Sequence, residues 1–327
     1  MTLVILQPAG TDTSEFNFNS TMKKTVSLDK IAKYDKAYGE YLSNIYKDGG
    51  APTWGVTPAK NKSNAKKWER VNRGDVVFFY AQKRYFATAV VTGKLHCKSL
   101  ALDLWGWKDR NEGVTWEYIY FLDELKFINI SLNDMNKLID YTKDKFLQGF
   151  TVLSQEKSNE VLNIYEYESD TYVPSYDFDS YRNALSKFQS GQPLDAEGKA
   201  LRRAEQGFLR QHLFGSSLTG YCGVCGEELP VNLLVAAHIK KRAECTPEEK
   251  LDVFNIVMPM CKLGCDDLYE RGYISVKDGE IVVNEQKYLT SSLKVYIEKI
   301  NKKLCLHWSE ESLKYFEWHN NKHGFSY

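Results

Sequence analysis

The sequence predicts an α+β protein with two domains, and three features indicate this. Its 327 residues are too many for one ordinary hydrophobic core, so two domains and a connecting segment are expected. The first half combines runs of β-branched and aromatic residues with helical patterns. Four of the seven cysteines fall in two tight pairs in the second half, which is typical of a metal-stabilised module. Hydrophobic residues at 43% and charged residues at 26% fit a globular protein.

The charge composition constrains how the protein could bind nucleic acid. Its 43 basic and 43 acidic residues give a formal net charge of zero. A nucleic-acid binder of this composition must therefore concentrate positive charge locally. No apolar stretch is long enough to span a bilayer, and "MTLVILQPAGTDTSEF" lacks the basic start of a signal peptide. We therefore expect a cytoplasmic protein, in which paired cysteines bind metal and do not form disulfides.

The first domain, residues 1–165, is expected to be rich in strands. Residues 76–96 predict a hairpin of two buried strands around a Lys-Arg turn, and "GVTWEYIYFLDEL" adds a strand. "MNKLIDYTKDKFLQ" predicts a helix that Ser131 or Asn133 could cap. Residues 166–198 are polar with turn residues, which predicts a linker containing one short helix.

The second domain, residues 199–327, is expected to open with a helix. "AEGKALRRAEQGFLRQHLFG" places Leu201, Phe208, Leu209 and Leu213 on roughly one face, and Gly215 is a plausible stop. A further helix is predicted at "SSLKVYIEKINKKL" near the end of the chain.

Two cysteine pairs define a candidate zinc site. Cys222 and Cys225 form a C-x₂-C knuckle, and Cys261 and Cys265 form a C-x₃-C knuckle. Two such knuckles can close a tetrahedral thiolate site around zinc, and a site with four thiolates is structural because it has no open position. The alternative is two unrelated pairs of buried free thiols. The other cysteines are interpreted as ordinary thiols: Cys97, Cys245 and Cys305.

The segment between the knuckles carries the candidate catalytic residues. A strand-like run, "VNLLVAAHI", leads into a basic loop and then into "DVFNIVMPMC". A short helix, "DDLYERGY", and a hairpin turning at Asp278-Gly279 follow. This order places His238 at a strand end, Asn255 ahead of the second knuckle and Asp266 at the start of the helix.

This arrangement resembles the HNH nucleases, the ββα-metal finger family. The matching segments are Cys222 and Cys225, "AAHI" with His238, "NIVMPMC" with Asn255 and Cys261, and "CDDLYERGYI" with Cys265 and Asp266. The preceding "RRAEQGFLRQHLFG" resembles the helix that leads into this module in many restriction-type members, and "YFEWHNNKHGF" near the end is also similar to such enzymes.

The resemblance implies a role for each of three residues. His238 would be the general base, because a neutral imidazole with a pKa of about 6.5 can take a proton from water. Asn255 would hold the loop and orient His238 through its amide. Asp266 would bind the catalytic Mg²⁺ or Mn²⁺ that stabilises the scissile phosphate. The chain departs from the family in carrying Asp266 where a histidine is usual, and in carrying Ala237, which cannot ligate metal, just before the base.

Each of these residues also has a simpler interpretation. His238 could be a core histidine, Asn255 a turn former and Asp266 a helix cap. Lys240, Lys241 and Arg242 could form a solvated loop, although contact with the DNA backbone is favoured beside a phosphate-cutting base.

The first domain carries basic and aromatic residues that could recognise DNA. Lys66, Lys67 and Arg73 lie in a local basic run that could track phosphates. "W…VNRGDVVFFYAQKRYFATAVV" is similar to the EVE and PUA-like small β-barrels, whose pocket holds a modified base. The candidate pocket residues, in order of preference, are Trp54 and Trp68, which lie in loop-like text, and then Trp105 and Trp107, which flank a glycine. The alternative is that most of these aromatic residues are core.

Together these features predict a modification-dependent restriction endonuclease of bacteria, used in defence against phage. Its substrate would be double-stranded DNA with 5-methyl- or 5-hydroxymethylcytosine flipped into the first domain. One finger cuts one strand, so a homodimer or two independent nicks would be needed for a double-strand break. The alternative is a DNA- or RNA-binding regulator in which the zinc module is only a scaffold.

Overall fold

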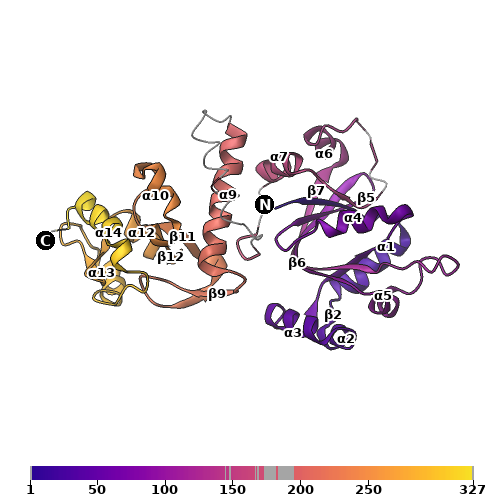
Figure 1. Cartoon of the computed structure of the whole chain (residues 1–327), viewed down its shortest axis with the longest axis horizontal. Coiled ribbons are helices and arrows are strands. Elements are labelled where there is room, and N and C mark those ends of the chain that lie inside the picture. Colours follow the sequence, from indigo (N-terminus) through magenta and orange to yellow (C-terminus); the bar gives the residue numbers. More distant parts are fainter. Residues whose placement is uncertain are drawn as a thin grey trace. The chain divides into compact units, whose positions relative to one another are not determined.

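The computed structural model describes residues 2–143, 145–146, 149–165, 167, 169–172, 182 and 195–325. Most of the predicted linker, residues 166–198, and its short helix therefore lie outside the described residues. The chain divides into two compact units, and the division falls between Ala200 and Leu201. Figure 1 shows both units, each combining helices with strands. No helix in the described part of the chain is long and apolar enough to cross a membrane.

The first unit is built on one mixed sheet of six strands. The strands, in sheet order, are β4 (Thr53–Val56), β7 (Tyr118–Ser131), β6 (Arg84–His96), β5 (Val76–Ala81), β1 (Val4–Pro8) and β8 (Thr151–Val152). β1 and β5 are parallel, and the other pairs are antiparallel. The register between β6 and β7 shifts at three places, and such bulges bend a sheet. The two edge strands, β4 and β8, do not pair with each other. Among the described residues, the expected β-barrel is therefore a curled sheet that stays open.

Both faces of this sheet are buried by helices. Along β1 and β5, alternate side chains enter two different hydrophobic clusters, as the period of two in a strand requires. One cluster includes residues of α6 (Leu132–Leu138) and α7 (Gln155–Tyr165). The opposite cluster includes residues of η1 (Phe18–Lys23) and α4 (Ser63–Glu69). The remaining elements of the unit are α1 (Asp12–Asn17), β2 (Val26–Ser27), α2 (Leu28–Ala32), α3 (Lys36–Ile45), β3 (Gly50–Ala51), η2 (Lys60–Lys62) and α5 (Lys98–Trp105).

Most elements expected in the first unit are present, with one shortened. β5 and β6 form the predicted hairpin, and its turn uses positive φ angles at Gln82 and Lys83. The predicted helix from Met135 ends as α6 at Leu138, because Asp140 adopts a left-handed φ of 50° that stops the helix. Its cap is Ser131, whose hydroxyl accepts a hydrogen bond from the Asp134 amide.

The predicted long helix is α9 (Asp195–Phe214), which belongs to the second unit from Leu201 onward. Phe208 and Leu209 are buried in the core of the unit, and Gly215 ends the helix with a φ of 56°. The Arg210 guanidinium donates to the carbonyls of Val231 and Leu234, both 2.7 Å away, which connects α9 to η3 (Val231–Leu233) and to the start of β11 (Leu234–His238).

The predicted strand–loop–strand–helix order follows α9. β11 (Leu234–His238) pairs antiparallel with β12 (Val257–Cys261), and α12 (Cys265–Glu270) comes directly after. β13 (Ile274–Lys277) and β14 (Glu280–Val283) form the expected hairpin with positive φ at Asp278 and Gly279. The other elements are β9 (Thr219–Tyr221), β10 (Glu228–Pro230), η3 (Val231–Leu233), η4 (Arg242–Glu244), α10 (Pro247–Leu251), α11 (Val253–Ile256), α13 (Ser291–Glu298) and α14 (Glu310–His323).

Candidate metal centre and catalytic pocket

The two cysteine knuckles meet in the core of the second unit. The sulfur atoms of Cys222, Cys225, Cys261 and Cys265 all lie within 4.8 Å of one another, and all four residues are buried. A zinc ion with Zn–S bonds of about 2.3 Å needs four sulfurs in this range. This four-cysteine group could bind a structural zinc ion.

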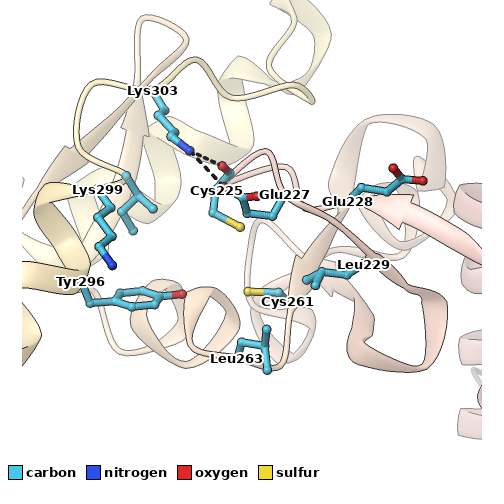
Figure 2. Close-up of a pocket in the computed structure, with 10 residues that line it drawn as sticks. Cys225, Glu227, Glu228, Leu229, Cys261, Leu263, Tyr296, Lys299 and Lys303 are labelled. Carbon is cyan, nitrogen blue, oxygen red and sulfur yellow. Dashed lines mark hydrogen bonds and ion pairs between the residues drawn. The ribbon is translucent and has the colours of Figure 1, made fainter.

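The backbone around each knuckle is shaped for this convergence. The Gly226 amide donates to the Cys222 carbonyl at 2.9 Å, and Gly226 has a φ of 73°. Hydrogen bonds from the Cys222, Cys225 and Cys265 thiols hold the pKa of Cys261 well below its usual range. Figure 2 shows the Cys225 and Cys261 sulfurs beside a pocket bordered by Tyr296, and Lys303 donating to the Cys225 carbonyl at 2.7 Å. Four sulfur donors held close together have the chemistry that a structural zinc ion requires.

The structure brings His238 and Asp266 to one pocket. His238 ends β11, Asp266 is the second residue of α12, and both line a cavity of about 280 Å³. The other lining residues are Ala237, Lys241, Arg242, Ala243, Tyr269 and Glu270. The pocket therefore combines one imidazole, two carboxylates, from Asp266 and Glu270, and two cations, from Lys241 and Arg242.

The environment of the pocket keeps the His238 ring uncharged. Burial lowers the pKa of His238 below its usual value, the Glu205 carboxylate partly opposes this, and Arg242 adds to it. A neutral imidazole is the form that can accept a proton. Burial raises the pKa of Asp266, and the neighbouring Asp267 and Glu270 carboxylates raise it further. A cation beside Asp266 would relieve this repulsion.

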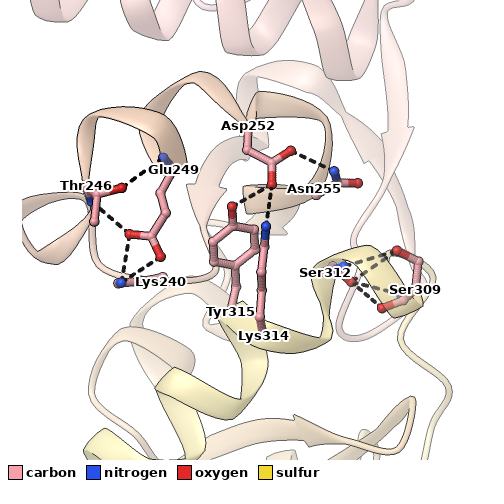
Figure 3. A network of polar contacts seen from close by, with 9 residues as sticks. All are labelled: Lys240, Thr246, Glu249, Asp252, Asn255, Ser309, Ser312, Lys314 and Tyr315. Atoms are coloured by element: carbon pink, nitrogen blue, oxygen red, sulfur yellow. Dashed lines mark hydrogen bonds and ion pairs between the residues drawn. The ribbon is translucent and has the colours of Figure 1, made fainter.

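Asn255 does not contact His238 as predicted. Its amide donates to Asp252 at 2.7 Å, and Asp252 also accepts hydrogen bonds from Tyr315 and Lys314 (Figure 3). Burial favours a higher pKa for Asp252, but these three donors hold it below its usual value. Asn255 thus bonds within the first turn of α11, and Asp252 connects that turn to α14.

The basic loop after His238 is neither bare nor simply solvated. The Lys240 ammonium pairs with Glu249 at 2.8 Å, and its side chain is only 12% exposed. Lys241 pairs with Glu270 at 3.0 Å, and Arg242 pairs with the buried Glu205 at 2.6 Å. Lys240 is therefore tied to α10 (Figure 3), whereas Lys241 and Arg242 lie at the pocket.

In the first unit, the predicted DNA-binding cations have different environments. Lys66 is exposed on α4, while the Lys67 ammonium donates to the Phe150 carbonyl at 2.8 Å. Arg73 lies over the ring of Tyr172, 5.3 Å from its centroid. Lys67 and Arg73 thus have structural contacts, and Lys66 is the better placed of the three for a phosphate.

The tryptophans predicted for the base pocket divide in the same way. Trp54 and Trp68 do not lie in loops, because Trp54 belongs to β4 and Trp68 to α4, and both are buried in one hydrophobic cluster. Trp105 is half-buried and donates to the Thr21 hydroxyl at 3.3 Å. Trp107 is 41% exposed, with the Lys98 ammonium 5.4 Å from its ring. The role of these residues as a base pocket stays a prediction, and exposure favours Trp107 over Trp54 and Trp68.

Tyr269 and Glu270 line the pocket and Glu205 pairs with its Arg242, and none of the three was predicted from the sequence. Glu205 lies four residues before Leu209 on the apolar side of α9, and a carboxylate in that position was a usable signal. Tyr269 lies three residues after Asp266, so both occupy one side of α12. A tyrosine at this position gave no sign in the sequence that its hydroxyl has a polar role.

Comparisons with known proteins give a similarity to solved structures but none to a protein family. No family model matches the chain, and no curated protein matches it. Among solved structures, the chain is similar to the N-terminal domain of McrB from Thermococcus gammatolerans bound to m5C DNA. The two are 18% identical, the similarity covers 50% of this chain and 98% of that chain, and the TM-score is 0.36. A TM-score this low does not establish a shared fold, so function is inferred below from the residues of this chain.

Proposed function

We propose that the protein is a modification-dependent DNA endonuclease, in which the second unit cuts DNA and the first unit recognises a modified cytosine. One observation carries the nuclease assignment. His238 and Asp266, from a strand and a helix joined through the cysteine cluster, line the same pocket with Lys241 and Arg242. This is the set of groups that hydrolysis of a phosphodiester needs.

In the proposed reaction, the neutral His238 ring accepts a proton from a water molecule as that water attacks phosphorus. Lys241 and Arg242 line the pocket and would contact the phosphate oxygens. The Asp266 carboxylate would hold a divalent ion. Ala237, at the position where a second protein ligand would be expected, has no side-chain atom that can bind a metal. Water and phosphate oxygens would complete the coordination, as Mg²⁺ tolerates. A bound Mg²⁺ or Mn²⁺ supplies positive charge to the scissile phosphate and the leaving 3′ oxygen.

Recognition of a modified cytosine is assigned to the first unit. Trp107 is exposed beside the Lys98 cation, and Trp105 is half-buried on the other side of Gly106. Aromatic rings stack on bases and cations contact the backbone, so this corner of the unit could hold a base turned out of the duplex. Restriction of phage DNA is the biological role that follows, with two copies or two nicks for a double-strand break.

A second candidate function is a DNA- or RNA-binding regulator without catalysis. It is favoured by Ala237, which leaves the metal with few protein ligands, and by the acidic partners of Lys240, Lys241 and Arg242. In that case the zinc module would only present a binding surface.

The test is nicking of phage DNA that contains 5-methyl- or 5-hydroxymethylcytosine, compared with unmodified DNA, in Mg²⁺ and in Mn²⁺. We expect metal-dependent nicking of modified DNA, and a fall of about 10² to 10⁴-fold in the rate for His238→Ala with binding retained. His212→Ala is the control, because His212 is an exposed histidine of the same unit that does not line the pocket. Equal nicking by His238→Ala would remove the catalytic assignment. Binding without nicking by the unaltered protein would favour the regulator.

A further inference from the structure

Tyr269 connects the wall of the catalytic pocket to the peptide that follows His238. It is 3% exposed, and its hydroxyl donates a hydrogen bond of 3.1 Å to the carbonyl of Ile239, the residue after His238. The Ile239 amide donates to the Ile256 carbonyl at 2.8 Å, so the backbone after His238 is held on both sides. Tyr269 also lies on α12, the helix that carries Asp266.

His319 on α14 supports Tyr269 from behind. Its ring stacks on the Tyr269 ring with centroids 3.8 Å apart and an interplanar angle of 16°. Its Nε2 lies 2.9 Å from the Tyr269 carbonyl oxygen, and its Nδ1 lies 2.8 Å from the Ser275 hydroxyl. Because a carbonyl can only accept, Nε2 carries the proton and Nδ1 accepts from Ser275.

This buried histidine is therefore held in one neutral form. It is 3% exposed, and burial lowers the pKa of His319 to about 3, although the hydrogen bond to the Tyr269 carbonyl opposes this. His319 thus joins three elements, α12, β13 and α14, through fixed contacts.

We propose that Tyr269 is a positioning residue for His238, and that His319 sets the position of Tyr269. The proposal rests on the proposed function of the pocket. A phenylalanine would fill the space of the Tyr269 ring, so the hydroxyl is not needed for packing. Its contribution is the bond to the Ile239 carbonyl, which fixes the direction in which the preceding His238 ring leaves the backbone. Asn255, the residue expected to orient His238, bonds to Asp252 instead.

The first test is Tyr269→Phe in the full-length protein, with nicking of modified DNA as the readout. We expect kcat to fall about tenfold to a hundredfold, because a base that is slightly misplaced loses rate. KM should remain within about twofold, since DNA contacts are unchanged. The matched control is Tyr273→Phe, because Tyr273 also packs against this core and its hydroxyl makes no hydrogen bond among the described residues.

The second test separates the hydrogen bond of His319 from its bulk. His319→Gln keeps a donor that can reach the Tyr269 carbonyl, so most of kcat should be retained. His319→Phe keeps the stacked ring but loses both hydrogen bonds, so kcat should fall as in Tyr269→Phe. Equal kcat for the two variants would overturn the role of His319.

A third measurement does not depend on cleavage. The ring resonances of His238 in labelled protein should shift or broaden in Tyr269→Phe and remain unchanged in Tyr273→Phe. Unchanged His238 resonances in Tyr269→Phe would overturn the proposal even if the protein cuts DNA. A His238→Ala variant that cuts normally would instead overturn the proposed function.

Discussion

The candidate site residues predicted from the sequence lie in different environments in the two units. In the second unit, His238 and Asp266 come from a strand and a helix to line one pocket, and four distant cysteines form one cluster. In the first unit, Trp54 and Trp68 lie in the hydrophobic core, and Lys67 donates to a backbone carbonyl. The residues predicted from the spacing of a motif lie together in the structure. The aromatic and basic residues predicted from composition alone include several that pack in the core or bond to the backbone.

The largest expected difference between the two units would follow from removing the zinc ion that the four-cysteine group could bind. Cys261→Ser or a strong zinc chelator should abolish the thermal transition of the second unit, because binding of a structural zinc supplies about 10 kcal/mol or more in small zinc modules. The transition of the first unit should not change. Calorimetry with metal analysis of the same samples would measure both.

Cys245→Ser is the control for that experiment. Cys245 is buried in the same core but lies outside the four-cysteine cluster, and its thiol donates to the Lys240 and Lys241 carbonyls. Its replacement should leave bound zinc unchanged. If Cys261→Ser bound zinc as the unaltered protein does, the metal centre would lie elsewhere.

Replacing tryptophans tests whether packing and recognition are separate in the first unit. Trp54→Ala should lower the free energy of unfolding by about 3–5 kcal/mol, because it leaves a cavity in the core. Trp107→Ala should change it by less than about 0.5 kcal/mol, since the side chain is 41% exposed, but should weaken the preference for modified DNA.

Chemical denaturation and competition binding with modified and unmodified duplexes would measure the two effects. If Trp107→Ala leaves the preference unchanged, the base is recognised in another part of the first unit.

The two units should also respond to acid in opposite directions. Burial raises the pKa of Asp75 in the first unit to about 7, although hydrogen bonds from the Leu3 and Asn72 amides oppose the rise. The folded unit therefore binds this proton more tightly than the unfolded chain, and stability is lost as pH rises from about 4 to 7. His319 has a pKa lowered to about 3, so its contribution is present above about pH 6.5 and is lost as pH falls.

Lowering the pH from 7 to 5 should therefore stabilise the first unit and destabilise the second, each by roughly 2 kcal/mol. Calorimetry at both pH values would show the two transitions moving apart in opposite senses. His319→Gln should remove the acid response that this histidine adds to the second unit and leave that of the first. Parallel shifts of both transitions would contradict the assignment.

The smallest expected difference lies within the basic loop. Lys240→Ala should cost about 1–3 kcal/mol of stability, because its 12% exposed ammonium pairs with Glu249. Lys241→Ala should cost less than about 0.5 kcal/mol, because its pair with Glu270 is exposed. The DNA affinity of the Lys241→Ala variant should fall about threefold to tenfold, since Lys241 lines the pocket.

Denaturation curves and binding titrations on the two variants would test this pair. A larger loss of stability in Lys241→Ala than in Lys240→Ala would reverse the assignment of the two lysines.

The parts of the site that could be predicted are those fixed by short stretches of chain. The clustering of the cysteines, the strand ending at His238 and a helix with Asp266 in its first turn depend on short stretches of chain, and all are present. The β5–β6 hairpin of the first unit was likewise predicted from runs of β-branched and aromatic residues. The extent of the helix after Ser131 was not, because a left-handed Asp140 ends it early.

The contacts that could not be predicted join residues far apart in the sequence. Asp252 bonds to Tyr315, 63 residues away. Arg242 finds Glu205, 37 residues earlier in α9. A pattern of letters shows that these side chains are polar, but their partners depend on how α9, α11 and α14 are packed.

The acidic partners of the basic loop have a consequence for binding in salt. A free lysine that meets a phosphate releases a condensed counterion, which makes affinity fall steeply as ionic strength rises. If DNA displaced the exposed Glu270 from Lys241, the freed carboxylate would take up a cation from solution and offset that release. The loop should therefore bind DNA with a shallower salt dependence than its three positive charges suggest.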